Sequence, residues 1–342
     1  MAYDNATSAT TMAPAVAPTA PSRQRPAPIV TLTVNPALDV STTTETVMPE
    51  HKMRCGASRV DPGGGGVNVS RVIERLGGHS TAIYAVGGAT GQAYRQLLEA
   101  EGIIGLAISI AGSTRQNVTV DETSTGQQFR FVLQGPQLVE SEWMQCFVAT
   151  DAAMSLGGYV VPSGSLAPGM PDDFYARIAH RARELGVRCV VDASGDALAA
   201  AVEEGVYLVK PSGRELGELV GVSLASIDEK VEAARELVAR GRVEVVALTL
   251  GGDGAALVTA EGVTRLASPP IMVRSTVGAG DSFLAAMVLR LAQGCDLAAA
   301  FRAGVAAGAA TATTAATELC HRDDVERFER NLERNLECDL ER

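Results

Sequence analysis

Short runs of β-branched residues alternate with helical patterns along most of this chain of 342 residues. The alternation starts with a predicted strand at 29–34, passes through a glycine-rich turn into the helical pattern VNVSRVIERLGG, and reaches a second strand at 80–86. A helix near 92–101 comes next. The second half repeats the rhythm with predicted strands at 152–161, 187–192, 206–209 and 243–250. This alternation is typical of a three-layer α/β domain, in which helices cover both faces of a mainly parallel sheet.

Two segments interrupt this rhythm. At 38–60 and 116–133 apolar and polar residues alternate, and the second segment contains a T-S-T-G turn. Alternation with a period of two around a turn indicates antiparallel strands, so we expect a small β-sheet lid that projects from the main domain. A projecting sheet with a partly apolar face needs a cover, which the substrate cleft, a second subunit or both can supply. We therefore expect a lid that also joins two copies in a homodimer.

Charge and cysteine content exclude several classes of protein. The formal net charge of -11 argues against a nucleic-acid partner, because such a chain cannot neutralise many backbone phosphates. The six cysteines are scattered, without a Cys-x-x-Cys pair or a Cys/His cluster, so neither a zinc site nor a disulfide framework is predicted. A reducing, cytoplasmic location fits this cysteine usage best.

The two ends of the chain have their own composition. Residues 1–27 are rich in Ala, Thr, Pro and Ser, and we expect a disordered tail that precedes a single domain at 28–342. This tail has no apolar run long enough for a signal peptide or a membrane span, so no membrane partner is expected. At the other end, residues 322–342 alternate acidic and basic side chains around Val325, Phe328 and Leu332, which indicates an amphipathic helix.

The segment 275–283, with the sequence STVGAGDSF, carries the strongest chemical signal. Gly278, Ala279 and Gly280 can form a tight turn at the start of a helix, where unpaired N–H groups and the helix dipole favour an anion such as phosphate. Asp281 follows, and a carboxylate beside a bound phosphoryl group can accept a proton from an attacking hydroxyl. On the motif alone, a simple helix cap and turn are equally good interpretations.

A second glycine cluster at 62–68 also leads into a helical pattern. Four consecutive glycines exceed what a turn requires, so a ligand is expected to approach the backbone at Gly64 and Gly65. Asn68 could present its amide to sugar hydroxyls, or it could bond to the local backbone. Asp39 follows the first predicted strand, at the sheet edge where ligands bind in α/β proteins, although turn formation is the commoner task of such a residue.

Two further segments follow predicted strands. In Lys210-Pro-Ser-Gly-Arg-Glu215, the lysine can neutralise a phosphate and Glu215 can hold a water of Mg²⁺. The same residues also read as an ordinary helix start, with Ser212 and Glu215 forming a capping box. In Thr249-Leu-Gly-Gly-Asp-Gly254, a strand enters a glycine-rich bend that can lie beneath a nucleotide or form a hairpin.

Taken in order, these segments resemble the PfkB carbohydrate kinases, a ribokinase-like family. The family has a Gly-Gly-rich segment near its N-terminus and a G-A-G-D segment near its C-terminus, and this chain has both, so the resemblance spans nearly all of it except the tail. Within the family the chain is similar to the phosphofructokinases. Gly65 and the patterns at 52–55, 114–117 and 190–195 are most like the ribokinase-type, ATP-dependent 6-phosphofructokinases.

The resemblance implies a role for each matching residue. In the family mechanism the phosphoryl group passes directly from MgATP to the sugar, while Asp281 takes the hydroxyl proton and the amides of residues 278–280 stabilise the moving charge. The residues implied to hold the sugar are Asp39, Gly64, Gly65 and Asn68. Those implied to bind its phosphate are Arg115, Arg54 and Lys52. Those implied to line the ATP site are Lys210, Ser212, Thr249, Gly251, Gly252, Gly254, Val273 and Val305, with Glu215 near Mg²⁺.

Two positions depart from the family pattern. The family element N-x-x-E stands here as Ser212-x-x-Glu215, which changes an amide to a shorter hydroxyl and puts the rate and metal preference in question. The resemblance implies a potassium site at carbonyls such as those of Ser275 and Val277, whereas the sequence ATTAATE at 312–318 argues against carrying that site over.

The expected activity is the phosphorylation of fructose 6-phosphate to fructose 1,6-bisphosphate. A kinase for fructose 1-phosphate or tagatose 6-phosphate is the nearest alternative. A kinase for a free sugar or a nucleoside is less well supported, because Arg115 and Arg54 would then lack an anionic partner. A non-catalytic protein that binds sugar phosphate and regulates is the alternative of another class. Ser212 favours that alternative and Asp281 opposes it.

Overall fold

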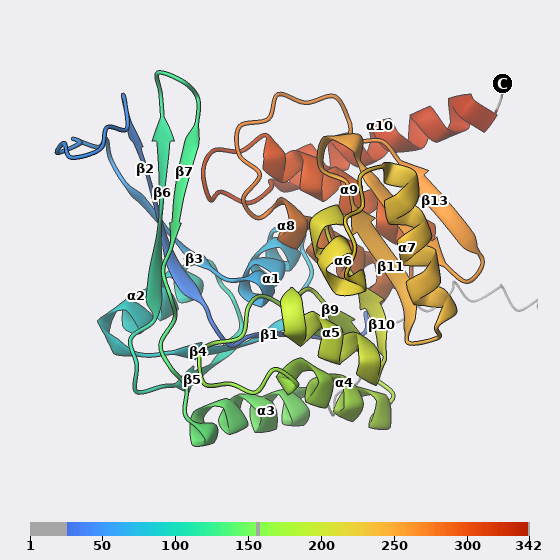
Figure 1. Ribbon diagram of the computed structural model, residues 1–342, viewed down its shortest axis with the longest axis horizontal. Helices are drawn as coiled ribbons and strands as arrows, with labels where there is room; N and C mark the ends of the chain where they lie inside the picture. The colour runs from blue at the N-terminus through green and yellow to red at the C-terminus, as the bar shows by residue number, and fades with distance from the viewer. Residues whose placement is uncertain (1–25, 155–157, 341–342) are drawn as a thin grey trace, which may run out of the picture.

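The computed structural model describes residues 26–154 and 158–340 and contains one large and one small β-sheet (Figure 1). The large sheet has nine strands, and all its neighbours are parallel from β11 to β5, while β12 and β13 extend one edge in antiparallel fashion. In spatial order the strands are β13 (Gly262–Leu266), β12 (Ala255–Thr259), β11 (Val243–Thr249), β10 (Val206–Val209), β9 (Arg188–Val191), β8 (Tyr159–Pro162), β1 (Ile29–Thr33), β4 (Thr81–Val86) and β5 (Gly105–Ser109).

Helices cover both faces of the large sheet, as the strand–helix alternation predicts. The helices whose residues pack on one face are α3 (Glu140–Met154), α4 (Phe174–Glu184), α5 (Gly195–Glu204), α6 (Gly213–Val220) and α7 (Ile227–Ala239). Those on the other face are α1 (Gly65–Arg75), α8 (Ala279–Ala292), α9 (Leu297–Ala312) and α10 (Arg322–Leu340). Helix α2 (Gly88–Ala100) packs beside β4 and the small sheet. The three-layer α/β architecture is therefore confirmed.

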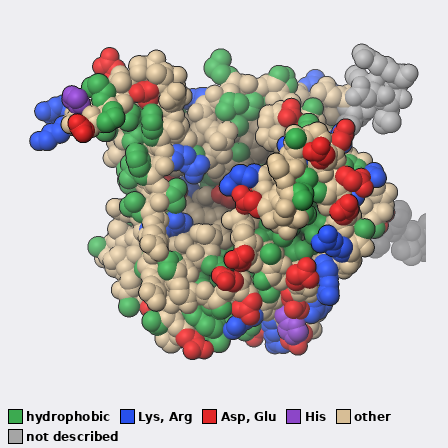
Figure 2. All heavy atoms as spheres, viewed as in Figure 1, with side chains coloured by type: hydrophobic (Ala, Val, Ile, Leu, Met, Phe, Trp, Pro, Cys, Tyr) green, Lys and Arg blue, Asp and Glu red, His purple; other side chains and the backbone are tan. Residues whose placement is uncertain are grey.

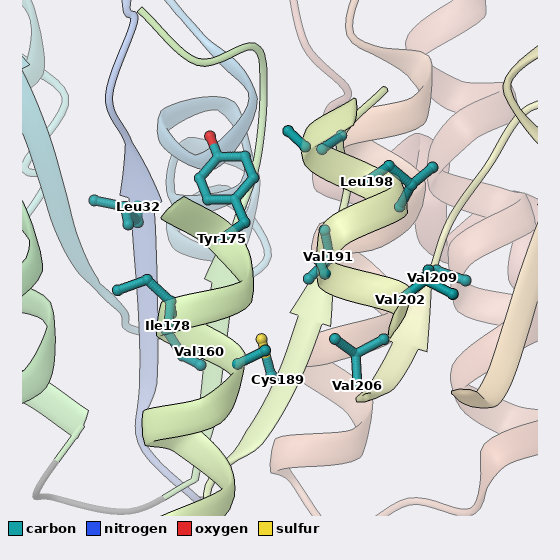
Figure 3. Packing of buried hydrophobic residues seen from close by; sticks show 14 of the residues in the cluster. Leu32, Val160, Tyr175, Ile178, Cys189, Val191, Leu198, Val202, Val206 and Val209 are labelled. Atoms are coloured by element: carbon teal, nitrogen blue, oxygen red, sulfur yellow. The ribbon is translucent and has the colours of Figure 1, made fainter. Parts of the chain in front are cut away.

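Successive side chains of the central strands point to opposite faces of the sheet and pack into two separate hydrophobic cores. Val190 packs with the layer of α1, α8 and α9, whereas the next residue, Val191, packs with α4 and α5. Figure 3 shows part of the second core, where Tyr175 and Ile178 of α4 face Leu32 of β1. Burying each such side chain contributes about 1.5–3 kcal/mol. Strands buried on both faces are mostly apolar, which explains their nearly continuous β-branched runs, and the two buried polar residues of β1, Thr31 and Thr33, are hydroxyl residues of the same branched shape.

The small sheet stands apart from the large one and forms the left wall of the molecule in Figure 1. Its order is β3 (Arg59–Gly63), β2 (Ala37–Thr44), β6 (Arg115–Glu122) and β7 (Gln128–Val132). The predicted lid segments thus form a sheet, and the β6–β7 hairpin is antiparallel, with Gly126 at a positive φ of 72° in its turn. The prediction of a wholly antiparallel sheet is wrong, because β2 and β6 are parallel. Both follow parallel strands of the large sheet, β1 and β5, and both run outward from it.

The predicted strand at 152–161 needs correction, and most of the predicted tail at 1–27 lies outside the described residues. The predicted strand at 152–161 is wrong in its first part, because α3 extends to Met154 and β8 begins only at Tyr159. One apolar run serves both elements, and periodicity does not separate them. The predicted tail at 1–27 lies outside the described residues except for its last two. Over 26–154 and 158–340, no helix is long and apolar enough to cross a membrane.

The C-terminal helix confirms the predicted amphipathic pattern. Val325, Phe328 and Leu332 of α10 are buried in the core that α8 and α9 also form, while the charged positions between them are mostly exposed. These three side chains lie three and four residues apart, so they share one face of the helix. The helix therefore closes the outer layer beside α9.

Candidate active site

The G-A-G-D segment forms the N-terminus of α8. Gly278 is the N-cap residue with a positive φ of 74°, and the helix begins at Ala279. No side chain caps this end, and of its first N–H groups that of Ala279 donates to the carbonyl oxygen of Thr276 at 3.3 Å. A Cβ on Gly280 would lie 3.0 Å from the Nζ of Lys210, which is tighter than an ordinary contact, so glycine leaves room for the ammonium here. The local geometry is that of an anion site at a helix N-terminus.

Asp281 points away from its own helix end and is not the cap. Its Oδ2 accepts a hydrogen bond of 2.8 Å from Nδ2 of Asn68 in α1. Burial raises the pKa of Asp281, while the Asn68 bond and the nearby Lys210 ammonium pull the pKa back down. The two structural alternatives from the sequence, a cap at Asp281 and a local backbone bond for Asn68, are thus wrong. A buried carboxylate with a raised pKa is suited to accept a proton.

Lys210 also faces Asp192, which was not among the predicted site residues. Its Nζ lies 3.1 Å from Oδ1 of Asp192, at the ends of β10 and β9, where 7% of the lysine side chain and 14% of the aspartate side chain are exposed. Burial raises the pKa of Asp192 to about 6, although Lys210 acts in the opposite direction. Burial lowers the pKa of Lys210, but Asp192 and Asp281 outweigh that effect and raise it. One ammonium therefore lies between two partly buried carboxyl groups, beside the helix end that can hold an anion.

Carboxyl ends of parallel strands supply the floor of the cleft. Ser163 follows β8 directly, as Asp192 follows β9 and Lys210 follows β10, while Asn35 comes two residues after β1. The Oγ of Ser163 and the Oδ1 of Asn35 are buried and have no hydrogen-bond partner among the described residues. Buried polar atoms without partners are rare in folded proteins and suit a ligand's hydroxyl groups. A polar residue directly after each strand was a sequence signal for these positions.

The glycine cluster at 62–68 brings backbone close to these atoms. Gly64 has a positive φ of 125° before α1, and a Cβ on Gly65 would lie 2.2 Å from the Oγ of Ser163. Gly63 makes room for Asp39, whose Oδ2 would lie 1.9 Å from a Cβ there. Asp39 lies within β2 of the small sheet, and its Oδ1 accepts a hydrogen bond of 2.8 Å from Asn117. The structure thus gathers Asp39, Gly64 and Gly65 at the mouth of the cleft.

Basic residues predicted for the sugar phosphate fall into two groups. Arg115 begins β6 and donates to the carbonyl oxygens of Asn35, at 3.0 Å, and Leu133, at 3.1 Å. Its Nε is buried and has no partner within the described chain. Lys52 and Arg54 are exposed on the connection between β2 and β3, and neither bonds to any described residue. The structure does not bring these two to Asp281.

Arg130 of β7 was not predicted. It lines a small cavity together with Asp39, Asn117 and Thr317. Its positive charge lowers the pKa of Asp39 and of Asp281, opposing the larger effect of burial at both. Figure 2 shows this face of the molecule hollowed between the small sheet and the main domain, with basic and acidic side chains at the hollow. Arg130 lies within a strand and belongs to no local motif, so its place in the cleft follows only from how the strands pair in the lid.

A second, larger cavity of about 780 Å³ has Gly280 in its wall. It is bounded by α8, α9 and the bend after β11, where Thr249 ends the strand and residues 251–253 form a 3₁₀ turn. The sequence allowed either a nucleotide-binding bend or a hairpin at 249–254. β11 and β12 do form an antiparallel hairpin, and the bend between them also lines the cavity. Its lining includes the predicted residues Ser212, Thr249, Gly251, Gly252, Gly254, Val273, Val305, Ala279 and Gly280.

Ser212 and Glu215 form the capping box that the sequence allowed. Ser212 N donates to Glu215 Oε2 at 2.8 Å, and Glu215 N donates to Ser212 Oγ at 3.3 Å. Glu215 Oε1 forms no bond with the described residues. Mg²⁺ keeps most of its waters and needs only one or two carboxylates, so this oxygen fits such an ion. Within the described ranges no three His, Cys, Asp or Glu side chains form a metal cluster.

The two segments discussed for a potassium site, 275–277 and 312–318, contact each other. Ser275 Oγ donates to the carbonyl oxygen of Ala316 at 2.7 Å, and Val277 N donates to Ser275 Oγ at 3.3 Å. Ala316 has a positive φ of 52°, which is uncommon for a residue with a side chain. The loop at 312–318 therefore supports residues 275–277 directly.

Comparison with known proteins assigns the family. Residues 32–324 match the model of the pfkB family carbohydrate kinases. The chain belongs to this family. It is 47% identical over 300 residues to the ATP-dependent 6-phosphofructokinase isozyme 2 of Mycobacterium tuberculosis, covering 88% of each protein. It is 41% identical over 307 residues to isozyme 2 of Escherichia coli, covering 90% of this chain and 99% of that protein.

Solved structures agree with this PfkB assignment. Phosphofructokinase-2 from Escherichia coli in complex with fructose-6-phosphate has a TM-score of 0.84 and 39% identity to this kinase, over 90% of this chain and 99% of that one. Ribokinase of Arabidopsis thaliana, complexed with ribose and ATP, shares the fold with a TM-score of 0.71 at 18% identity. The predicted ribokinase-like architecture and kinase family are both confirmed.

Proposed function

We propose that this PfkB kinase transfers the γ-phosphoryl group of ATP to fructose 6-phosphate, giving fructose 1,6-bisphosphate. The observation that carries the proposal is the position of Asp281. It lies at the uncapped N-terminus of α8, between the cavity of about 780 Å³ and the polar cleft beneath the lid. The identity of 41–47% to 6-phosphofructokinases of isozyme 2, over most of the chain, supports this choice of sugar phosphate.

The chemistry follows from the placement of charge. Asp281, ionised and held by Asn68, accepts the proton of the attacking hydroxyl. The amides at 278–280 and the Lys210 ammonium stabilise negative charge on the phosphoryl group in flight, as preorganised donors do in a site of low dielectric. Magnesium, when bound with ATP, supplies charge neutralisation on the phosphates, and Glu215 would hold one of its waters. No covalent enzyme intermediate is needed.

We assign the sugar to the cleft beneath the small sheet. Asp39 accepts hydrogen bonds from sugar hydroxyls there, while the buried oxygens of Ser163 and Asn35 gain the partners that they lack. The free Nε of Arg115 and the side chain of Arg130 supply positive charge for the sugar's phosphate. Lys52 and Arg54 can add to this charge only if their loop, or that of a second copy, reaches the cleft.

We also propose a homodimer formed through the lid. Val60, Val40, Val118 and Phe131 lie opposite one another across the four strands, so they form an apolar row on a single face of the small sheet. The row's outer members, Val60 and Phe131, are exposed. The opposite face carries Asp39 and turns toward the cleft. An exposed apolar face of this kind suits a second copy of the chain. One Escherichia coli structure is described as a tetrameric inhibited form, which shows that this relative self-associates.

Two minor assignments accompany the proposal. A potassium ion near the carbonyls of Ser275 and Val277 is supported by the Escherichia coli structure described in complex with potassium, and the local sequence at 312–318 opposes it. A cytoplasmic location is supported by the five described cysteines, which are all free thiols.

The test is a panel of acceptors under identical conditions. ADP release from MgATP is measured with fructose 6-phosphate, fructose 1-phosphate, tagatose 6-phosphate and free fructose. We expect the highest kcat/KM for fructose 6-phosphate and negligible turnover of free fructose, which has no phosphate for Arg115. A higher value for another ketose phosphate would refute the substrate assignment and keep the family. If the protein binds sugar phosphate but turns over none of the four, the regulatory alternative replaces the enzyme.

A further inference from the structure

Arg71 of α1 is the largest side chain that is fully buried in the described chain, with 1% of its surface exposed. It follows the glycine cluster within the segment VNVSRVIERLGG, no role was predicted for it, and it lines neither the cavity of about 780 Å³ nor the small cavity at Arg130. A buried guanidinium is costly unless all its donors are paired, so its surroundings show what it is held for.

The guanidinium of Arg71 joins three elements. Its Nε and Nη2 donate to the carboxylate of Glu101, at the end of α2, at 2.7 and 2.6 Å. Its Nη1 donates to the carbonyl oxygen of Pro62 in β3 at 2.9 Å, and Nη2 reaches Oδ1 of Asp61 at 3.4 Å. A further contact of Nη1, at 3.4 Å, is with Oδ1 of Asn68, one turn earlier on α1.

The contact with Asn68 determines how its amide lies. A guanidinium has donors only, so the side of the amide that faces Arg71 must be the oxygen. The NH₂ group then points to Asp281, where Nδ2 donates to Oδ2 at 2.8 Å. The opposite orientation would set the amide N–H groups against the guanidinium and the amide oxygen against the carboxylate. Both contacts would then be repulsive.

We propose that Arg71 is a positioning residue for catalysis: it fixes the Asn68 amide so that an N–H is always directed at Asp281, and it ties this arrangement to strand β3 of the lid. The proposal rests on the assignment of Asp281 as the base. The tie to the lid continues beyond Arg71, because Asp61 also accepts hydrogen bonds from Arg59 and from Thr317 in the loop beside the G-A-G-D segment.

The consequence is measurable as a pH dependence. Burial raises the pKa of Asp281, whereas the Asn68 N–H lowers it, so losing that bond raises it further. The other charged groups that act on Asp281 are Lys210, Asp192, Asp39 and Arg130, and none of them contacts Arg71. Around Arg71 the charged groups are Glu101, Asp61 and Arg75.

The test compares Arg71→Lys with the wild type through the pH profile of kcat. Lysine keeps the positive charge beside Glu101, but its single ammonium cannot span Pro62, Asp61 and Asn68 together. We expect the acidic limb of kcat to move up by about one pH unit, as in Asn68→Ala, and the double variant to show no further shift. A merely structural role would lower the melting temperature and leave the limb in place.

Arg75→Lys is the matched control. Arg75 lies one turn further along α1, is partly buried, and donates to the carbonyl oxygen of Leu319 rather than to Asn68. Its replacement should leave the acidic limb where it is. If Arg71→Lys does not fold, Glu101→Gln, which weakens the anchor of Arg71, should shift the limb in the same direction by less. An unshifted limb in the folded variant overturns the proposal, whereas absence of turnover in the wild type would instead refute the proposed function.

Discussion

Replacing Asp192 by asparagine should stabilise the protein relative to the wild type more at pH 8 than at pH 5. Burial raises the pKa of Asp192 to about 6, roughly two units above that of an ordinary aspartate. Each unit corresponds to about 1.36 kcal/mol, so keeping Asp192 ionised costs the folded state about 3 kcal/mol at pH 8. Because the folded-state pKa exceeds the unfolded value, the stability of the wild type falls as pH rises through this range.

The assay is urea unfolding of both proteins at pH 5 and pH 8. Asparagine has no charge to bury, so the stability of Asp192→Asn minus that of the wild type should increase by roughly 1–2 kcal/mol between these pH values. The attraction of Lys210 is already contained in the pKa of Asp192, and Lys210 stays protonated at both pH values, so its loss adds no separate pH dependence. A difference that is the same at pH 5 and pH 8 would refute the claim that Asp192 is held ionised at a cost.

Two further predictions test neighbouring features. Gly280→Ala places a Cβ 3.0 Å from Lys210 Nζ, and because Lys210 is held by Asp192 we expect kcat/KM for ATP to fall about tenfold in steady-state assays, with the melting temperature little changed. An unaltered value would show that Lys210 can move away freely. Phe131→Asp places a charge in the apolar row of the lid, so sedimentation equilibrium should detect a monomer where the wild type is a dimer. An unchanged mass would place the dimer contact elsewhere.

The sequence alone predicted the part of the candidate site that comes from one continuous segment. The G-A-G-D turn, its helix and Asp281 lie within a few consecutive residues, and helix-terminus chemistry depends only on such neighbours. The alternation of strands and helices likewise predicted the three layers, because burial on both faces of a strand constrains every residue in it. Both predictions rest on interactions of short range along the chain.

Features of the site that bring together distant segments of the chain could not be predicted from the sequence. Asp192 and Ser163 come from different strand ends, and only the parallel sheet order places them in one cleft. Arg130 reaches the cleft through the register of a hairpin, in which it lies opposite Thr119. The parallel pairing of β2 with β6 follows from where both strands leave the large sheet, which alternation of side chains does not encode.

The most direct test of the central claim is ³¹P NMR of the protein with MgATP and fructose 6-phosphate, comparing the wild type with Asp281→Asn. The account predicts that fructose 1,6-bisphosphate and ADP appear in equal amounts with the wild type. It also predicts that the rate falls by about 10²–10⁴-fold in the variant, which keeps the shape but cannot accept the proton. A variant that forms the bisphosphate at the rate of the wild type would contradict the assignment of Asp281 as the base.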